Sequence, residues 1–200
     1  MQQNFVLKIA KESLSGLKSN TLITHIKNIK ITANLEIVNH LLKVSFDILI
    51  PTKLQPDVIW HTLDDNSFQQ KDFLWEDTCL ECFIGDITHT EYIEINASPK
   101  GYFSIYHFDD YRTPKSMPPR ALAINSTENA IISWQKQTDT YQRTFMFDMD
   151  NLPNHLKSAT LFNPTLILYL KNNHLPLFFA KEQATPADFH DQNFWIPISD

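Results

Sequence analysis

Two stretches, FLWEDTCLECFIG (residues 73–85) and EYIEINASPKGYFSIYHFDDYR (residues 91–112), decide the fold of this chain. Apolar residues recur at every second position through the runs 78–84, 91–97 and 102–108, which is the spacing of a β-strand with two unlike faces. The apolar face consists of Leu80, Cys82, Ile84, Ile93, Ile95, Ala97, Phe103 and Ile105. We therefore predict three strands that turn one shared face towards a core.

The opposite face of the same runs carries polar and aromatic side chains. If the runs are neighbours in an antiparallel sheet, this face consists of Glu81, Glu94, Asn96, Ser98 and Tyr106, flanked by Trp75. Carboxylate and amide groups bind hydroxyls, and an indole stacks on the C–H face of a sugar, so the mixture suits a polyhydroxylated ligand. A solvated sheet face would show the same alternation without a ligand. The density of aromatic residues in the segment favours a binding surface.

Strands are also predicted on both sides of this segment. Residues 31–38 and 41–50 alternate in the same way, and the polar pair Asn39-His40 between them favours a tight turn. Further strands are predicted at 121–125, 130–136, 141–147, 165–171, 176–181 and within 189–198, with turns at 126–129 and 137–140.

Helix is almost absent from this pattern. Only residues 10–19 look helical, and the prolines of TPKSMPPR (residues 113–120) exclude regular structure there. Many short strands with almost no helix predict a single all-β domain over residues 1–200, an antiparallel β-sandwich of the jelly-roll type.

The composition excludes several classes of function. The chain of 200 residues has a net charge of −6 and three well-spread arginines, so we expect no nucleic-acid partner. No apolar run approaches the length needed to cross a bilayer, and the N-terminus lacks a secretory pattern, so we expect a cytoplasmic protein without a membrane partner. Cys79 and Cys82 are predicted to be free thiols on opposite faces of a strand, one of them buried.

Three segments carry a resemblance to a known family. LWEDTCLECFIG, EYIEINASPKGYFSIYHFDDYR and the tail PADFHDQNFWI (residues 186–196) resemble bacterial DOMON-like domains related to family 9 carbohydrate-binding modules. The resemblance implies a β-sandwich in which two tryptophans hold a sugar ring and polar groups bind its hydroxyls. It assigns the first tryptophan to Trp75, the acidic residue to Glu81 and the second tryptophan to Trp195. Glu94 stands where the modules carry a basic residue, which removes a hydroxyl donor and adds negative charge.

The predicted function is non-catalytic binding of a small polar ligand, with a carbohydrate as the expected one. The predicted site consists of Trp75, Glu81, Glu94, Asn96, Tyr106, Arg112 and Trp195. Arg112 is expected to hold a carboxylate within the turn formed by residues 108–112. Trp195 lies between Phe194 and Ile196, a position that also suits a packing role. We expect no cofactor and no metal.

Three alternatives remain open at this point. Glu81 and Glu94 on adjacent strands could be the two carboxylates of a glycoside-processing enzyme. Other DOMON domains bind haem through a methionine and a histidine, for which the resemblance makes available Met117, Met146, Met149 and His190. A structural calcium could be held by carboxylates from Asp77, Asp109 or Asp110.

Overall fold

The computed structural model describes residues 1–62, 69–123, 132–135 and 141–198. Its strands are β1 (Gln2–Ile9), β2 (Lys30–Val38), β3 (Leu41–Leu49), β4 (Cys79–Gly85), β5 (Tyr92–Ala97), β6 (Phe103–Phe108), β7 (Ile132–Gln135), β8 (Gln142–Asp148), β9 (Leu161–Leu170), β10 (Leu175–Ala180) and β11 (Ile196–Pro197). The described part of the chain has one α-helix, α1 (Asn20–Lys27). Short 3-10 turns are η1 (Glu12–Leu14), η2 (Gln55–Asp57), η3 (Leu74–Glu76), η4 (Met149–Asn151), η5 (Asn154–Leu156), η6 (Asn172–His174) and η7 (Gln192–Phe194).

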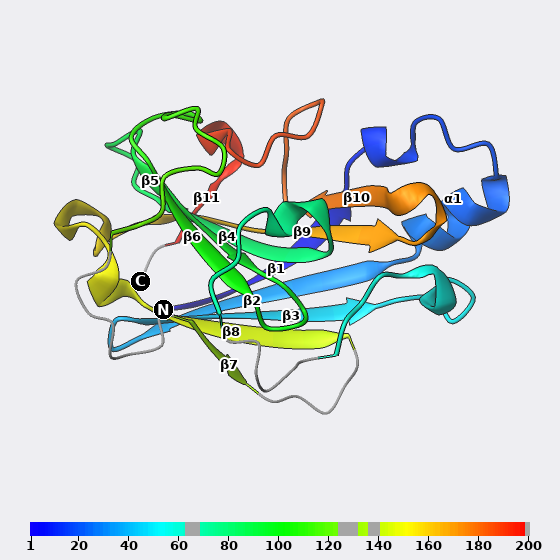
Figure 1. Ribbon diagram of the computed structural model, residues 1–200, viewed down its shortest axis with the longest axis horizontal. Coiled ribbons are helices and arrows are strands. Elements are labelled where there is room, and N and C mark those ends of the chain that lie inside the picture. The colour runs from blue at the N-terminus through cyan, green and yellow to red at the C-terminus, as the bar shows by residue number, and fades with distance from the viewer. Residues whose placement is uncertain (63–68, 124–131, 136–140, 199–200) are drawn as a thin grey trace.

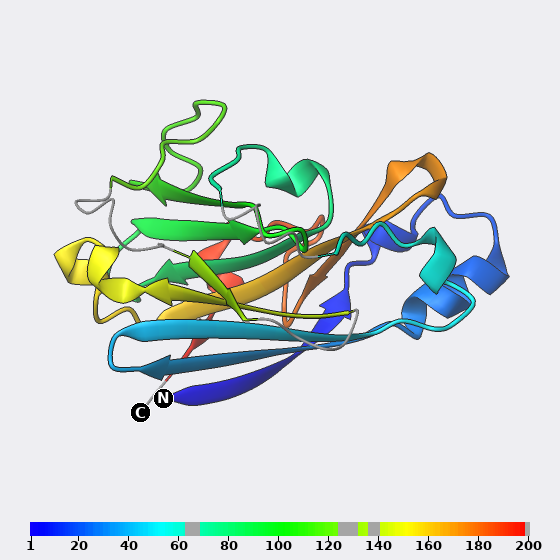
Figure 2. The same cartoon turned by 60° about the horizontal axis from the view of Figure 1, so that its bottom comes forward.

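The strands form one continuous antiparallel sheet, which curls (Figure 1). Its order is β6-β5-β4-β9-β10-β1-β2-β3-β8-β7, and β11 pairs with β9. β1 joins the two halves, because Gln2 to Leu7 pair with β2 while Lys8 and Ile9 pair with β10. Figure 2 shows β2 and β3 on one side of the molecule and β4 to β6 on the other. The predicted all-β antiparallel class is confirmed, but the strands belong to one sheet where we had predicted two.

The main core lies between the two halves of the sheet. Phe5, Leu35 and Phe46 enter it from one half, and Ile84 and Ile95 enter it from the other, each with at most 1% of its surface exposed. The residues that the period-two pattern assigned to the core are all buried: Leu80, Ile84, Ile93, Ile95 and Ile105. Burial of apolar surface of this extent is the main favourable term in folding.

Local signals explain the strand pairing and the misplaced helix. Asn39 and His40 both have positive φ values, of 50° and 63°, as a two-residue hairpin turn requires, so the predicted turn is confirmed. The predicted helix over residues 10–19 is wrong. α1 begins only after Ser19, whose side-chain oxygen caps it by accepting a hydrogen bond from the backbone N–H of Leu22 at 3.2 Å.

Other strand boundaries also differ from the prediction. β1 was not predicted, because only Phe5 and Leu7 within it are buried and its remaining residues are mostly polar. β9 begins at Leu161, before the predicted start, although Pro164 within it faces Cys82 of β4. The turns predicted at 126–129 and 137–140, together with parts of the strands beside them, lie outside the described residues.

Loops cover the second face of β4, β5 and β6. A second apolar cluster lies on this face and consists of Phe83, Tyr92, Tyr106, Phe108, Leu161, Ile167, Ala180, Phe189 and Trp195. Cys79 lies on this side and Cys82 in the main core, and both are buried free thiols, whereas we had predicted one buried thiol. No helix among the described residues is long and apolar enough to cross a membrane.

Replacing Ile95 by alanine should test the core assignment. Ile95 is fully buried, so Ile95→Ala should lower the free energy of unfolding by about 2–5 kcal/mol, from lost burial and the cavity left behind. Val6→Ala in β1 is the matched control, because this strand residue is 66% exposed and should cost less than about 1 kcal/mol. Urea unfolding measures both values, and equal losses would contradict the assignment.

Candidate functional site

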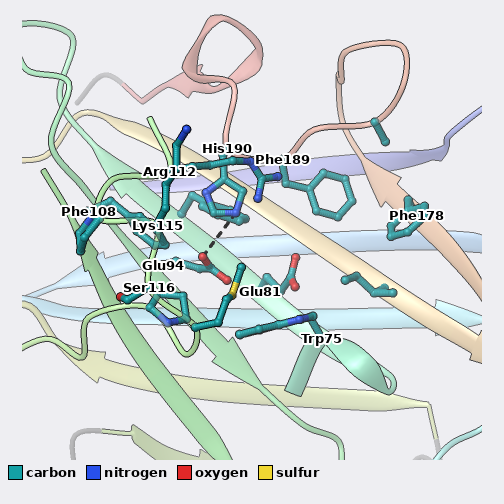
Figure 3. Close-up of a pocket in the computed structure, with 16 residues that line it drawn as sticks. Trp75, Glu81, Glu94, Phe108, Arg112, Lys115, Ser116, Phe178, Phe189 and His190 are labelled. Carbon is teal, nitrogen blue, oxygen red and sulfur yellow. Dashed lines mark ion pairs between the residues drawn. The ribbon is translucent and has the colours of Figure 1, made fainter. Parts of the chain in front are cut away.

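A pocket of about 420 Å³ lies above β4 and β5, under the loops that cover their second face (Figure 3). Residues from the strands, from the proline-rich loop and from the C-terminal segment line it: Trp75, Glu81, Phe83, Glu94, Phe108, Arg112, Pro114, Lys115, Ser116, Met117, Pro119, Ile167, Phe178, Ala187, Phe189 and His190. Most of these side chains are apolar, and a few convergent polar groups lie among them, which is the usual make-up of a small-molecule site.

Glu81 and Glu94 provide the carboxyl groups of the pocket. Strand register pairs Glu81 with Asn96 and Glu94 with Phe83, so the two glutamates are diagonal neighbours on one face. Both are buried, with 2% and 5% of their surface exposed. The Thr165 hydroxyl donates to Glu81 Oε2 at 2.7 Å, and Asn96 Nδ2 donates to Glu94 Oε1 at 2.6 Å.

Burial keeps these two carboxyl groups from ionising at their usual pH. Loss of solvent, followed by repulsion from Glu94, raises the pKa of Glu81 to about 8, against the hydrogen bond from Thr165 and the charge of Arg112. Loss of solvent raises the pKa of Glu94 to about 7, against the hydrogen bond from Asn96 and the charge of Arg112. The pair therefore changes its charge near neutral pH, which is frequent at functional sites.

His190 lies over Glu94 and comes from the C-terminal segment. Its Nδ1 is 2.6 Å from the Tyr92 hydroxyl, and that hydroxyl accepts a hydrogen bond from the backbone N–H of Arg112 at 3.1 Å. We infer that Tyr92 donates its hydrogen to Nδ1, which leaves the imidazole hydrogen on Nε2, 3.6 Å from Glu94 Oε2. Burial, helped by the charge of Arg112, lowers the pKa of His190 to about 3, so the ring is neutral.

Arg112 lies at the pocket wall and pairs with Asp188. Its Nη2 donates to Asp188 Oδ1 at 2.9 Å, and the Tyr111 hydroxyl donates to the other carboxylate oxygen. Burial opposes ionisation of Asp188, but these hydrogen bonds outweigh it and lower the pKa. The expected contact within residues 108–112 is therefore wrong: Asp109 is held by both terminal nitrogens of Arg120.

Aromatic side chains form the pocket walls. Trp75 is half-buried in the middle of η3, and its ring meets those of Phe73 and Tyr106 edge-on, with centroids 5.4 and 5.8 Å apart. Four phenylalanines complete the aromatic lining: Phe83, Phe108, Phe178 and Phe189.

Four of the seven predicted site residues line the pocket, namely Trp75, Glu81, Glu94 and Arg112. The other three lie close to it and support it. Asn96 is buried and binds Glu94, whereas buried Tyr106 packs on Trp75 and donates to Asp72 Oδ1 at 2.8 Å. Trp195 is buried, and its Nε1 donates to the Phe189 carbonyl oxygen at 2.8 Å.

The prediction missed the contributions of Tyr92, Phe178, Asp188 and Phe189, and it considered His190 only as a haem ligand or a loop residue. Tyr92 could have been found, because the period-two pattern already placed it on the face of Glu94. The other four come from parts of the chain that no local pattern relates to this sheet. Their placement depends on contacts such as that between Tyr92 and His190, which are 98 residues apart.

The lining residues do not fit a haem iron. Both ring nitrogens of His190 face other groups, since Nδ1 is bonded to Tyr92 and Nε2 is directed at Glu94. Met149 is buried in the main core, and only the exposed Met117 lines the pocket. Among the described residues, no group of three or more His, Cys, Asp or Glu side chains is arranged to hold a metal ion.

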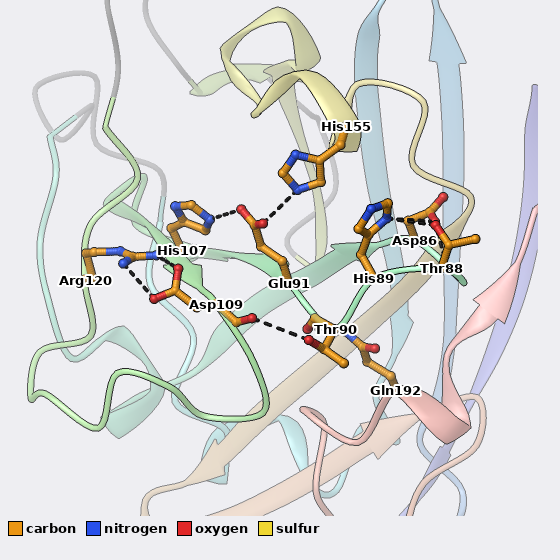
Figure 4. A network of polar contacts seen from close by, with 10 residues as sticks. All are labelled: Asp86, Thr88, His89, Thr90, Glu91, His107, Asp109, Arg120, His155 and Gln192. Carbon is orange, nitrogen blue, oxygen red and sulfur yellow. Dashed lines mark hydrogen bonds and ion pairs between the residues drawn. The ribbon is translucent and has the colours of Figure 1, made fainter.

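A second polar network lies outside the pocket, at the start of β5 (Figure 4). The carboxylate of Glu91 contacts His107 Nε2 with one oxygen and His155 Nε2 with the other, at 2.8 Å for His155. The rings of His155 and His89 lie 5.1 Å apart. These contacts join η5, which contains His155, to the β5 and β6 edge.

Comparisons with known proteins show a similarity of fold only. No protein-family model matches the chain, and no curated protein matches it. One solved structure is similar, a "putative carbohydrate-binding protein" from Bacteroides uniformis. The similarity has a TM-score of 0.53 at 8% sequence identity and covers 96% of this chain and 84% of that one.

Stability should depend on pH because Glu81 and Glu94 bind protons more tightly in the folded protein than in the unfolded chain. As neutral acids they stabilise the fold fully below about pH 4.5, and this contribution is lost as pH rises through about 7 and about 8. Glu81→Gln keeps an acceptor for Thr165 and cannot ionise. It should therefore be more stable than the wild type at pH 8 by about 1–3 kcal/mol, with little difference at pH 4.5.

Urea unfolding at pH 4.5, 6 and 8 measures this effect, and the exposed Glu182→Gln is the matched control. A Glu81→Gln variant that is less stable than the wild type at pH 8 would show that the folded protein holds Glu81 as a carboxylate.

Proposed function

We propose that the protein binds a small carbohydrate, without catalysis, in the pocket between Trp75 and the carboxyl groups of Glu81 and Glu94. The observation that carries this proposal is the position of a half-buried indole beside two buried carboxyl groups in one pocket. The indole offers an apolar face for the C–H groups of a sugar ring, and the carboxyl groups offer hydrogen-bonding partners for its hydroxyls.

The size and the make-up of the pocket support a small ligand. A volume of about 420 Å³ lies in the range of pockets that take drug-sized molecules. Lys115 and Ser116, on the proline-rich loop, add polar groups at the rim for hydroxyls that the buried groups do not reach.

The similar fold also supports this proposal. We infer that the curled sheet is a variant of the β-sandwich found in DOMON-like domains and family 9 carbohydrate-binding modules, which segments of the sequence resemble. The Bacteroides uniformis protein shares the fold across nearly the whole chain and is named for carbohydrate binding. At 8% identity the shared fold does not carry over the ligand, so the proposal depends on the pocket itself.

A glycoside-processing enzyme is the second candidate. It is favoured by one observation, that both carboxyl groups lie in the same pocket with raised pKa values, about 8 for Glu81 and about 7 for Glu94. A general acid must remain protonated at the working pH, as these values allow. Release of sugar from a glycoside panel, lost in Glu81→Gln, would establish this function in place of simple binding.

Replacing Trp75 by alanine tests the binding proposal. A thermal-shift screen with mono- and oligosaccharides identifies a ligand, and calorimetry then measures its affinity for the wild type and for Trp75→Ala. We expect a loss of about 1–3 kcal/mol, because the variant lacks the aromatic surface on which the sugar stacks.

The matched control is Tyr102→Ala, which removes a half-buried aromatic ring that lies under Lys71 and Lys100 and outside the pocket lining. This variant should bind the sugar as the wild type does. Equal affinities for the wild type and Trp75→Ala would contradict the proposed site.

A further inference from the structure

The carboxyl groups of the pocket have oxygen atoms that the protein does not use fully. Thr165 donates to Oε2 of Glu81, and the described part of the chain offers no second donor to this carboxyl group. Asn96 donates to Oε1 of Glu94, while Oε2 has only the longer contact of 3.6 Å with His190. Figure 3 shows both carboxyl groups in the middle of the pocket lining. Carboxyl oxygens that reach a pocket in this way can accept further hydrogen bonds from a ligand or from water.

The cation in the pocket wall is already paired. Arg112 donates to Asp188 at 2.9 Å, and its backbone N–H is bonded to Tyr92. His190 is neutral and adds no charge. Lys115 lies exposed on the rim, where solvent and salt screen its charge. The charge of Arg112 lowers the pKa of both glutamates, but its direct contacts are with Asp188 and Tyr92. Among the described residues, neither glutamate is paired with a buried cation, and both face the pocket.

We propose that the ligand carries a protonated primary amine, as in an amino sugar with a free amine, and that this ammonium group binds between Glu81 and Glu94. This inference rests on the proposed carbohydrate function and names the class of sugar. An ammonium group has three donors and no acceptor, which complements two carboxylates that need donors. A hydroxyl in the same position has one donor and no net charge.

The aromatic walls favour the same chemistry. Trp75, Phe83 and Phe108 surround the carboxyl groups, and aromatic faces attract a desolvated cation. Proteins commonly bind small organic cations between aromatic rings, and this pocket places aromatic rings around two carboxyl groups.

Proton release should accompany binding of the amine. The raised pKa values of Glu81 and Glu94 mean that part of the pair is protonated at pH 7, and an ammonium group would favour the carboxylate forms. The surrounding groups Tyr92, Arg112, Asp188 and His190, and the buried thiol of Cys79, have pKa shifts that keep their charges constant near this pH. Proton release would therefore come from the two glutamates.

Calorimetry at pH 7 with two matched pairs of probes tests the inference. The pairs are D-glucosamine with D-glucose, and cyclohexylamine with cyclohexanol, each differing by an amine in place of a hydroxyl. We expect the amine of each pair to bind about tenfold or more tightly, because it gains a buried charge pair. Glu81→Gln should reduce this preference most, whereas Trp75→Ala should weaken all four probes and the amines somewhat more, because it removes both stacking and a cation–π contact. Titration of cyclohexylamine in two buffers of different ionisation enthalpy should show proton release.

The outcomes separate this inference from the carbohydrate proposal. Equal binding of glucosamine and glucose, without proton release, overturns the amine inference and leaves the carbohydrate proposal standing. A preference for cyclohexylamine that Glu81→Gln reduces, without binding of either sugar, supports the amine, and the saccharide screen then decides the carbohydrate proposal. Binding of none of the four probes overturns the amine inference, and the saccharide screen then decides the carbohydrate proposal.

Discussion

The carbonyl oxygen of Phe189 holds the C-terminal segment over the sheet, and the pocket depends on this contact. It accepts hydrogen bonds from Trp195 Nε1 at 2.8 Å and from Asn163 Nδ2 at 3.2 Å, both from buried side chains. Gly85 allows the approach of Trp195, because a Cβ atom there would lie 2.8 Å from the indole ring. Together with the contacts of His190 with Tyr92 and of Asp188 with Arg112, this anchor keeps Phe189 and His190 in the pocket lining above Glu81 and Glu94.

Covering that face changes the chemistry of its carboxyl groups. On an open sheet Glu81 and Glu94 would be ordinary solvated carboxylates, and their burial under the loops raises both pKa values instead. Such an arrangement costs stability, since hydrophobic residues of similar size would pack in the same space without desolvating a charge. Under the proposed function, a ligand that binds the two acidic groups offsets this cost.

The strands around the site could be predicted from the sequence, but the position of the C-terminal segment that covers them could not. The period of two residues in 78–84, 91–97 and 102–108 assigned Glu81, Glu94 and Asn96 to one face, because side-chain direction in a strand depends only on local geometry. It left open whether that face is solvated. The answer depends on the segment that contains Asp188 and His190, whose contacts with Arg112 and Tyr92 span 76 and 98 residues.

A crystal structure of the protein with the tightest ligand found in the saccharide and amine screens tests the proposed site most directly. We expect the ligand to lie in the pocket, with its apolar face on Trp75 and its polar groups within hydrogen-bonding distance of Glu81 and Glu94. Density for the ligand elsewhere, for example on the outer face of β2 and β3 with the pocket unchanged, would contradict it.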